Sequence, residues 1–164
     1  MAKINLMPDL TSPHPLLVRE LRRSKLQKFF SSLPESSRHQ IDREVREVKK
    51  EETRQRRAQH AAEYLMEAME AELDPPPLMN AAFARNAKAH QGWEIMPQSL
   101  RRQHLIAIFR SRFPETRALY LERALLESAR YASTHAHPLA PARPPKSQGE
   151  PARIRLNQEP RAKG

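Results

Sequence analysis

Apolar residues recur at helical spacing along most of the chain, which predicts six amphipathic helices. We expect them at about residues 16–30, 35–50, 52–73, 83–93, 98–112 and 114–132. One face of the third helix is formed by Ala58, Ala61, Ala62, Leu65, Met69 and Leu73. Alanine and methionine at this spacing are typical of a packed core rather than of a cofactor-binding surface. The pattern therefore predicts an all-α fold.

Proline residues mark the ends of the predicted helices. Pro34 and Pro97 each precede a helix, and Pro114 suits the first position of the last helix. Three consecutive prolines from position 75 form a short, stiff spacer. For the helix after Pro34, the spacing of Ser32 and Glu35 fits a capping box, while Ser36 is an alternative N-cap.

One stretch of the chain occurs twice, 63 residues apart. Seven positions are identical between the copies: Pro34/Pro97, Ser36/Ser99, Arg38/Arg101, Gln40/Gln103, Glu52/Glu115, Thr53/Thr116 and Arg54/Arg117. Ordinary composition gives about one identity in such a window. A single repetition of this length indicates two copies of one supersecondary unit.

The repeat and the prolines together define the expected organisation. We expect an irregular arm at 1–15, a three-helix repeat at 16–74, a proline-rich linker at 75–79, a second three-helix repeat at 80–133 and a flexible tail at 134–164. From residue 135 onward the chain has six prolines, six Lys or Arg residues and two Glu residues. So little apolar surface cannot offset the entropy of ordering, so the tail is predicted to be disordered and cationic.

Composition restricts the function further. Only 38% of residues are hydrophobic and three are glycine, which indicates a modest core and disfavours a sheet-rich fold. The absence of cysteine excludes disulfides, thiolate zinc sites and cysteine nucleophiles, and it fits a reducing compartment. The sequence contains no secretory signal pattern and no apolar run long enough for a membrane span. We therefore expect a cytoplasmic protein without transmembrane segments.

Residue patterns of known enzymes are missing from the sequence. The seven histidines are scattered, and none forms the helical pair around a glutamate that a zinc hydrolase needs. The chain has no glycine-rich phosphate loop and no nucleophile elbow. We expect no catalytic, cofactor-binding or metal-binding residues and predict a protein that is not an enzyme.

The formal net charge of +10 favours a polyanionic partner, through counterion release and long-range attraction. The candidate polyanion-binding residues are Arg38, Arg43, Arg46, Lys49, Lys50, Arg54, Arg56, Arg57, Arg143, Lys146, Arg153 and Arg155. A structural alternative exists for the repeated arginines. Arg38 and Arg101 are each one helix away from a repeated glutamate, Glu52 or Glu115, and such ion pairs would orient consecutive helices. A DNA-binding helix-turn-helix is disfavoured because the turn lacks its usual glycine.

The repeated stretch resembles the helical domain of the YdeI/OmdA family (bacteriocin-protection, OmpD-associated). The shared pattern is aromatic-x-x-Leu-Pro-x-Ser-x-Arg, then an amphipathic helix, then Glu-Thr-Arg; it runs from Phe30 to Arg54 and, with Met96 replacing leucine, from Trp93 to Arg117. The chain departs from the family at Glu51, where proline is usual, and at Arg112-Phe113, where a lysine pair is usual. The family's small α/β domain has no counterpart. The resemblance implies an all-helical unit with a role in resisting antimicrobial peptides or envelope stress.

Two classes of function follow. The first is a basic helical module that binds nucleic acid or a ribonucleoprotein through the first repeat and the tail. The second is a YdeI-like stress or bacteriocin-resistance protein that acts through protein or membrane contacts. Because the chain is strongly basic, an acidic protein would suit the second class better than a cationic peptide.

Overall fold

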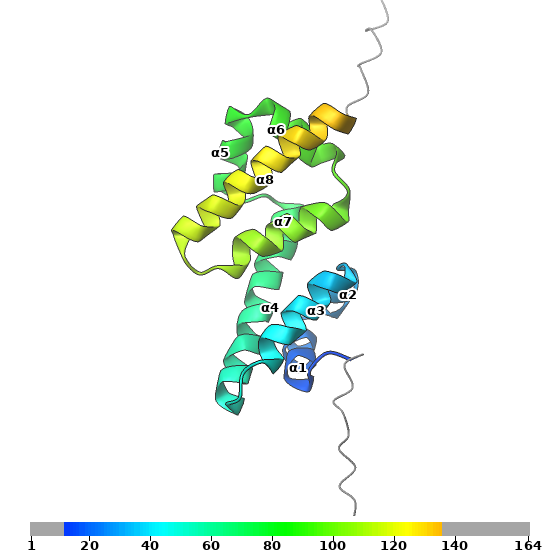
Figure 1. The fold of residues 1–164 in the computed structure, drawn as a ribbon, viewed down its shortest axis with the longest axis vertical. Coiled ribbons are helices and arrows are strands. Elements are labelled where there is room, and N and C mark those ends of the chain that lie inside the picture. The colour runs from blue at the N-terminus through cyan, green and yellow to red at the C-terminus, as the bar shows by residue number, and fades with distance from the viewer. Residues whose placement is uncertain (1–11, 136–164) are drawn as a thin grey trace, which may run out of the picture.

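The computed structural model describes residues 12–135, and these residues form eight α-helices and no strand (Figure 1). The helices are α1 (Pro15–Arg23), α2 (Gln27–Ser31), α3 (Glu35–Arg46), α4 (Glu51–Leu73), α5 (Pro77–Arg85), α6 (Ala87–Ile95), α7 (Gln98–Arg110) and α8 (Pro114–His135). The predicted all-α fold is confirmed. Most of the predicted arm (1–11) and most of the predicted tail (136–164) lie outside the described residues.

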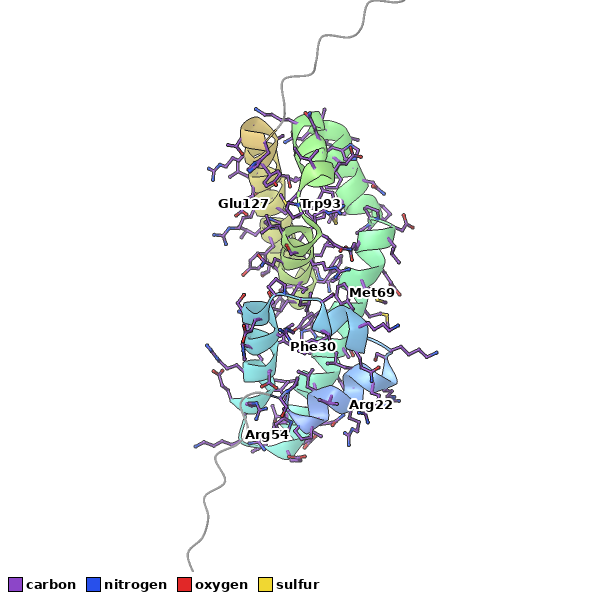
Figure 2. All side chains as sticks on the ribbon, turned by 90° about the vertical axis from the view of Figure 1, so that its right-hand side faces the viewer. Arg22, Phe30, Arg54, Met69, Trp93 and Glu127 are labelled. Carbon is purple, nitrogen blue, oxygen red and sulfur yellow. The ribbon has the colours of Figure 1, made fainter. Side chains whose placement is uncertain are left out.

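The long helix α4 joins two groups of helices. Helices α1 and α3 pack on α4, and α7 from the second group packs on it as well. In Figure 1, α1 to α3 surround one end of α4, while α5 to α8 form the other end of the molecule. One continuous hydrophobic cluster runs through both groups, and it includes Phe30 and Trp93, the repeat-equivalent aromatic residues labelled in Figure 2.

The predicted helix over residues 16–30 is two helices, because the chain turns sharply at Lys25, whose φ of 58° is left-handed. The N–H of Leu26 donates to the carbonyl of Leu21 at 2.8 Å, and the N–H of Lys25 donates to the carbonyl of Arg22 at 3.2 Å. These two bonds define a Schellman motif, which usually has glycine at the left-handed position. The turn fully buries Leu26, and the missing glycine explains why the sequence pattern did not reveal the break.

The predicted helix over residues 83–93 is also divided, at Asn86. Its side-chain oxygen accepts a hydrogen bond from the N–H of Ala89 at 3.0 Å and so caps α6. Each half of the molecule therefore has four helices instead of the three expected. Helix α5 already begins at Pro77, so the predicted linker at 75–79 is partly helical.

Helices α3 and α7 begin directly after the two repeated prolines. Pro34 has φ −54° and ψ 145°, and Pro97 has φ −55° and ψ 143°. No side chain caps either helix, so neither Ser32 nor Ser36 is the N-cap that the sequence suggested. The Ser32 hydroxyl instead donates to the carbonyl of Phe29 at 2.6 Å.

The other helix ends lie close to their predicted positions. Helix α3 ends at Arg46 rather than near residue 50, α7 ends at Arg110, and α8 continues to His135. Across residues 12–135, no helix combines the length and the apolar character needed to cross a membrane.

Candidate functional site

A cleft lies between the first turns of α4 and the loop that joins α7 to α8. Its volume is about 400 Å³, and it is lined by Thr53, Arg56, Arg57, His60, Arg110, Ser111, Arg112 and Phe113. Four of these eight residues are arginines and none is acidic. We call this feature the arginine cleft.

Helix geometry explains the α4 side of the arginine cleft. Residues 53, 56, 57 and 60 recur at the three- and four-residue spacing that places side chains on one face of a helix. The buried stripe of α4, which includes Ala58 and Leu65, packs into the core. The arginine-bearing face therefore remains at the surface, where Arg56 and Arg57 are exposed.

The opposite wall is a short loop fixed by hydrogen bonds. The Nε of Arg117, in the first turn of α8, donates to the carbonyl of Ser111 at 2.6 Å. The Ser111 hydroxyl accepts a hydrogen bond from the N–H of Phe113 at 3.2 Å. Arg117 also forms an ion pair with Glu67 of α4 at 3.1 Å, so the loop is held against α4. Phe113 itself is left 71% exposed.

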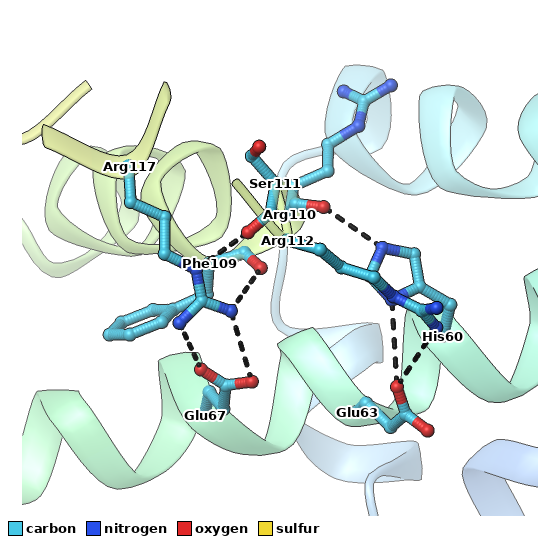
Figure 3. A network of polar contacts seen from close by, with 8 residues as sticks. All are labelled: His60, Glu63, Glu67, Phe109, Arg110, Ser111, Arg112 and Arg117. Atoms are coloured by element: carbon cyan, nitrogen blue, oxygen red, sulfur yellow. Dashed lines mark hydrogen bonds and ion pairs between the residues drawn. The ribbon is translucent and has the colours of Figure 1, made fainter. Parts of the chain in front are cut away.

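His60 connects the two walls (Figure 3). Its Nε2 lies 3.0 Å from the carbonyl oxygen of Arg110, and its Nδ1 lies 3.2 Å from the Nε of Arg112. Arg112 can only donate and the carbonyl can only accept, which assigns the imidazole proton to Nε2. Arg112 also lies 3.4 Å from the carboxylate of Glu63.

Glu44 of α3 holds two of the cleft arginines. Its carboxylate forms an ion pair with Arg110, and its backbone carbonyl accepts a hydrogen bond from Arg57 at 3.2 Å. Arg56 pairs with Glu52 at 2.5 Å, but both side chains are about three-quarters exposed, at 74% and 77%. The cleft thus contains two arginines positioned by α3 and two, Arg56 and Arg112, in solvent-exposed pairs.

The structure distributes the predicted polyanion-binding residues over several places. Arg56 and Arg57 line the arginine cleft. Arg43, Lys49 and Lys50 are exposed but do not line it. Four predicted residues, Arg143, Lys146, Arg153 and Arg155, lie outside the described residues.

Arg46 and Arg54 form hydrogen bonds within the chain that stabilise the fold. Arg46 contacts the carboxylate of Asp42 at 2.5 Å and donates to the carbonyl of Ser12 at 2.7 Å. Arg54 donates to the carbonyl of Val48 at 2.6 Å, in the loop between α3 and α4.

The predicted ion pairs of Arg38 with Glu52 and of Arg101 with Glu115 are wrong for the part of the chain that is described. The Nε atoms of Arg38 and Arg101 are both buried without a hydrogen-bond partner there. Glu52 pairs with Arg56 instead. Arg54 and Arg117 instead fix the loops that precede α4 and α8, because each donates to a carbonyl in that loop.

Sequence reasoning missed the half of the cleft that the end of α7 and the loop before α8 provide. Arg112 and Phe113 precede Glu-Thr-Arg in the second copy, just as Lys49 and Lys50 precede it in the first. That correspondence marked the position, but only the packing of α7 on α4 brings the loop beside Arg56 and Arg57.

Comparison with protein families finds one similarity, over the first helices of the chain. A family model described as "Bacteriocin-protection, YdeI or OmpD-Associated" matches residues 16–68, from α1 through most of α4. This match confirms the resemblance for the first copy. No curated protein matches the chain, and no solved structure does.

Proposed function

We propose that the protein is a non-enzymatic nucleic-acid-binding module and that the arginine cleft contacts the phosphates. The observation that carries this proposal is the convergence of four arginines beside an exposed aromatic ring. Arginine side chains supply many of the phosphate contacts that hold proteins on nucleic acids. An exposed ring such as Phe113 can stack on an unpaired base, which favours single strands.

The ion pairs around the cleft are weak enough for an incoming phosphate to displace their carboxylates. Exposed pairs such as Arg56 with Glu52 contribute only about 0–1 kcal/mol each. A phosphate can therefore replace the carboxylate of Glu52 or Glu63 with little loss of stability. Arg57 and Arg110 remain held by Glu44 in the meantime, so part of the site is arranged before binding.

We propose that the tail adds further phosphate contacts through Arg143, Lys146, Arg153 and Arg155. A cationic segment of this composition would follow a phosphate backbone and add to the salt dependence of binding. Removal of residues 136–164 should therefore weaken binding and flatten its dependence on salt.

We also propose that α5 to α8 form a second copy of the unit that the family model matches. Two observations support this proposal. The prolines before α3 and α7 have nearly identical backbone angles. Arg54 and Arg117 donate to carbonyls at equivalent positions, both at 2.6 Å. The arginine cleft would then be a site at the junction of two copies.

The family match supports a second candidate function. A YdeI-like protein would act in stress or bacteriocin resistance through protein or membrane contacts, with an acidic protein as its partner. An acidic protein partner would bind the same basic surface but would release fewer counterions than a nucleic acid. The steepness of the salt dependence separates the two candidates.

The test is fluorescence anisotropy with a labelled single-stranded oligonucleotide between about 50 and 200 mM salt. Replacement of Arg56, Arg57 and Arg112 by alanine should reduce the slope of log affinity against log salt by about 2–3, since each lost phosphate contact removes about one. A matched control replaces Arg22, Arg23 and Arg85, which are exposed and lie outside the cleft. An equal reduction of the slope in both variants would mean that the oligonucleotide binds elsewhere. An affinity that does not depend on salt would reject the proposal.

A further inference from the structure

The solvent-facing side of α8 carries leucines that are not part of the hydrophobic core cluster. Helix α8 buries Leu121, Ala124, Ser128 and Ala132 on one side. On the other side Leu119 is 68% exposed and Leu126 is 54% exposed. They are seven residues apart and therefore share a face. The groove around them has a volume of about 480 Å³ and is lined by Thr116, Leu119, Tyr120, Glu122, Arg123 and Leu126.

Charged residues flank these leucines in a symmetric order. At about 100° per residue, Glu115, Glu122, Arg123 and Arg130 all lie within about 60° of Leu119. Along the chain the face reads Glu115, Leu119, Glu122, Arg123, Leu126, Arg130. Read backwards, the order is the same except that every charge changes sign. The midpoint lies between residues 122 and 123.

We propose that a second copy of this chain docks on this face, with the two α8 helices antiparallel about a two-fold axis at that midpoint. Leu119 then lies opposite Leu126 of the partner subunit. Glu122 lies opposite Arg123 of the partner subunit, and Glu115 lies opposite Arg130 of the partner subunit. Two-fold symmetry makes each contact twice, as in any isologous dimer. We call this contact the α8 interface.

The charges of this face support a second copy over other occupants. Across residues 12–135, Glu115, Glu122 and Arg130 have no ion-pair partner, and Arg123 reaches only the exposed Glu127 at 3.6 Å. The face has two acidic and two basic residues, so it does not attract a polyanion. A parallel arrangement with the two helices in register would place like charges together, whereas the antiparallel arrangement pairs every one of the four with its opposite.

The length of the contact limits its strength. From Glu115 to Arg130 the helix rises about 22 Å, and one helix pair of that length makes a small interface. We expect a reversible dimer with a Kd on the order of micromolar. This inference is independent of the proposed function, because the α8 interface does not include the arginines of the cleft.

Because the chain has no cysteine, the arrangement can be tested by disulfide trapping. An equimolar mixture of the Leu119→Cys and Leu126→Cys proteins should form a cross-linked dimer under mild oxidation. Each protein alone should not, since two equivalent positions would be separated by about 10 Å along the axis, beyond disulfide reach. A mixture of Leu119→Cys with Leu78→Cys, which is exposed on α5, is the matched control. Cross-linking of one variant alone, or none in the first mixture, would overturn the proposal.

Charge reversal supplies an independent measurement by sedimentation equilibrium. Arg123→Glu places two like charges opposite each other on both sides of the axis and should raise the dimer Kd by about tenfold or more. The double variant with Glu122→Arg added restores both pairs and should recover most of the affinity. Failure of the double variant to recover, with helix content unchanged, would exclude this register. A wild-type chain that stays monomeric up to about 100-fold above micromolar concentration would exclude the dimer itself.

Discussion

Arg54 and Arg117, 63 residues apart, make the same hydrogen bond. Each guanidinium Nε donates to the carbonyl of the residue six positions earlier, Val48 or Ser111, and both distances are 2.6 Å. Each arginine lies in the first turn of a long helix, and each carbonyl lies in the loop just before that helix. The arginine of each Glu-Thr-Arg sequence therefore holds a loop against the helix that follows that loop.

Replacement of Arg54 or Arg117 by lysine should lower the free energy of unfolding by about 1.5–3 kcal/mol, the range for a hydrogen bond that involves a charged group. Lysine keeps the charge but lacks the planar fork that reaches the loop. Arg117 should be the more sensitive, because it also pairs with Glu67 and lies 5.4 Å from the centre of the Phe109 ring. Urea denaturation measures the effect, and the exposed Arg56→Lys is the control. Equal, small losses at all three positions would refute the structural role.

Gly92 lies where α6 crosses α8, with no room for a side chain. A Cβ atom at this position would lie 1.7 Å from the carbonyl oxygen of Ser128. In an ordinary helix interior, replacement of glycine by alanine raises the free energy of unfolding by about 1 kcal/mol. Gly92→Ala should reverse that sign and destabilise by about 1–3 kcal/mol, because α6 and α8 must separate. Thermal denaturation beside the exposed Gln91→Ala control provides the comparison, and a more stable Gly92→Ala protein would contradict the close crossing.

Arg102 and Glu72 form a largely buried ion pair that joins α7 to the end of α4. The Nε of Arg102 lies 2.9 Å from a carboxylate oxygen of Glu72, and the two side chains are only 14% and 11% exposed, respectively. Arg102 also lies over the Phe29 ring at 4.8 Å. Arg102→Met should cost about 3–5 kcal/mol, since it leaves the Glu72 carboxylate buried and unpaired.

The companion variant is Glu72→Gln, alone and together with Arg102→Met. The double variant should lose less stability than the sum of the two single losses, because it contains no unpaired charge. A double-mutant cycle from urea denaturation measures this coupling. Strict additivity would show that the pair contributes nothing to the junction of the two halves.

Stability should fall in mildly acidic solution because of His104. Burial lowers the pKa of His104 below its ordinary value of 6.5 and outweighs the opposite effect of Glu127. The unfolded chain then binds the proton more readily than the folded one. Stability is therefore full above pH 6.5 and falls as the pH drops through the folded-state pKa.

The measurement is the free energy of unfolding between about pH 5 and 8, because the unperturbed histidine pKa of about 6.5 lies in the middle of this range. His104→Gln should reduce the slope in this range. Some dependence of stability on pH should remain in this variant, because the pKa of His14 is also lowered, mainly by burial and in addition by the nearby charge of Arg46. An unchanged slope in His104→Gln would assign the dependence to other groups.

The helices and their order could be predicted from local signals. Apolar spacing identified α3, α4, α7 and α8 within a few residues, and prolines marked where α3, α7 and α8 begin. Two breaks were missed for different reasons. Lys25 adopts a left-handed conformation that is usually left to glycine, and Asn86 is a single capping residue inside an otherwise continuous pattern.

The candidate site could be predicted only in part, because its two walls are distant in sequence. Arg56 and Arg57 were recognised from charge alone, since they crowd the start of a long helix. The same charge count could not separate them from Arg46 and Arg54, which bond to backbone carbonyls. Arg110, Arg112 and Phe113 enter the site only through the packing of α7 on α4.

By itself, the sequence determined the helical class, the seven identities between residues 34–54 and 97–117 and the excess of positive charge, because periodicity, identity and charge are properties of the chain. Tertiary structure decided which charges are available to a partner. A guanidinium that bonds to a backbone carbonyl and one that faces solvent are identical in sequence, and only the arrangement of the helices separates them. The same arrangement turned the leucines of α8 outward, which no local pattern could show.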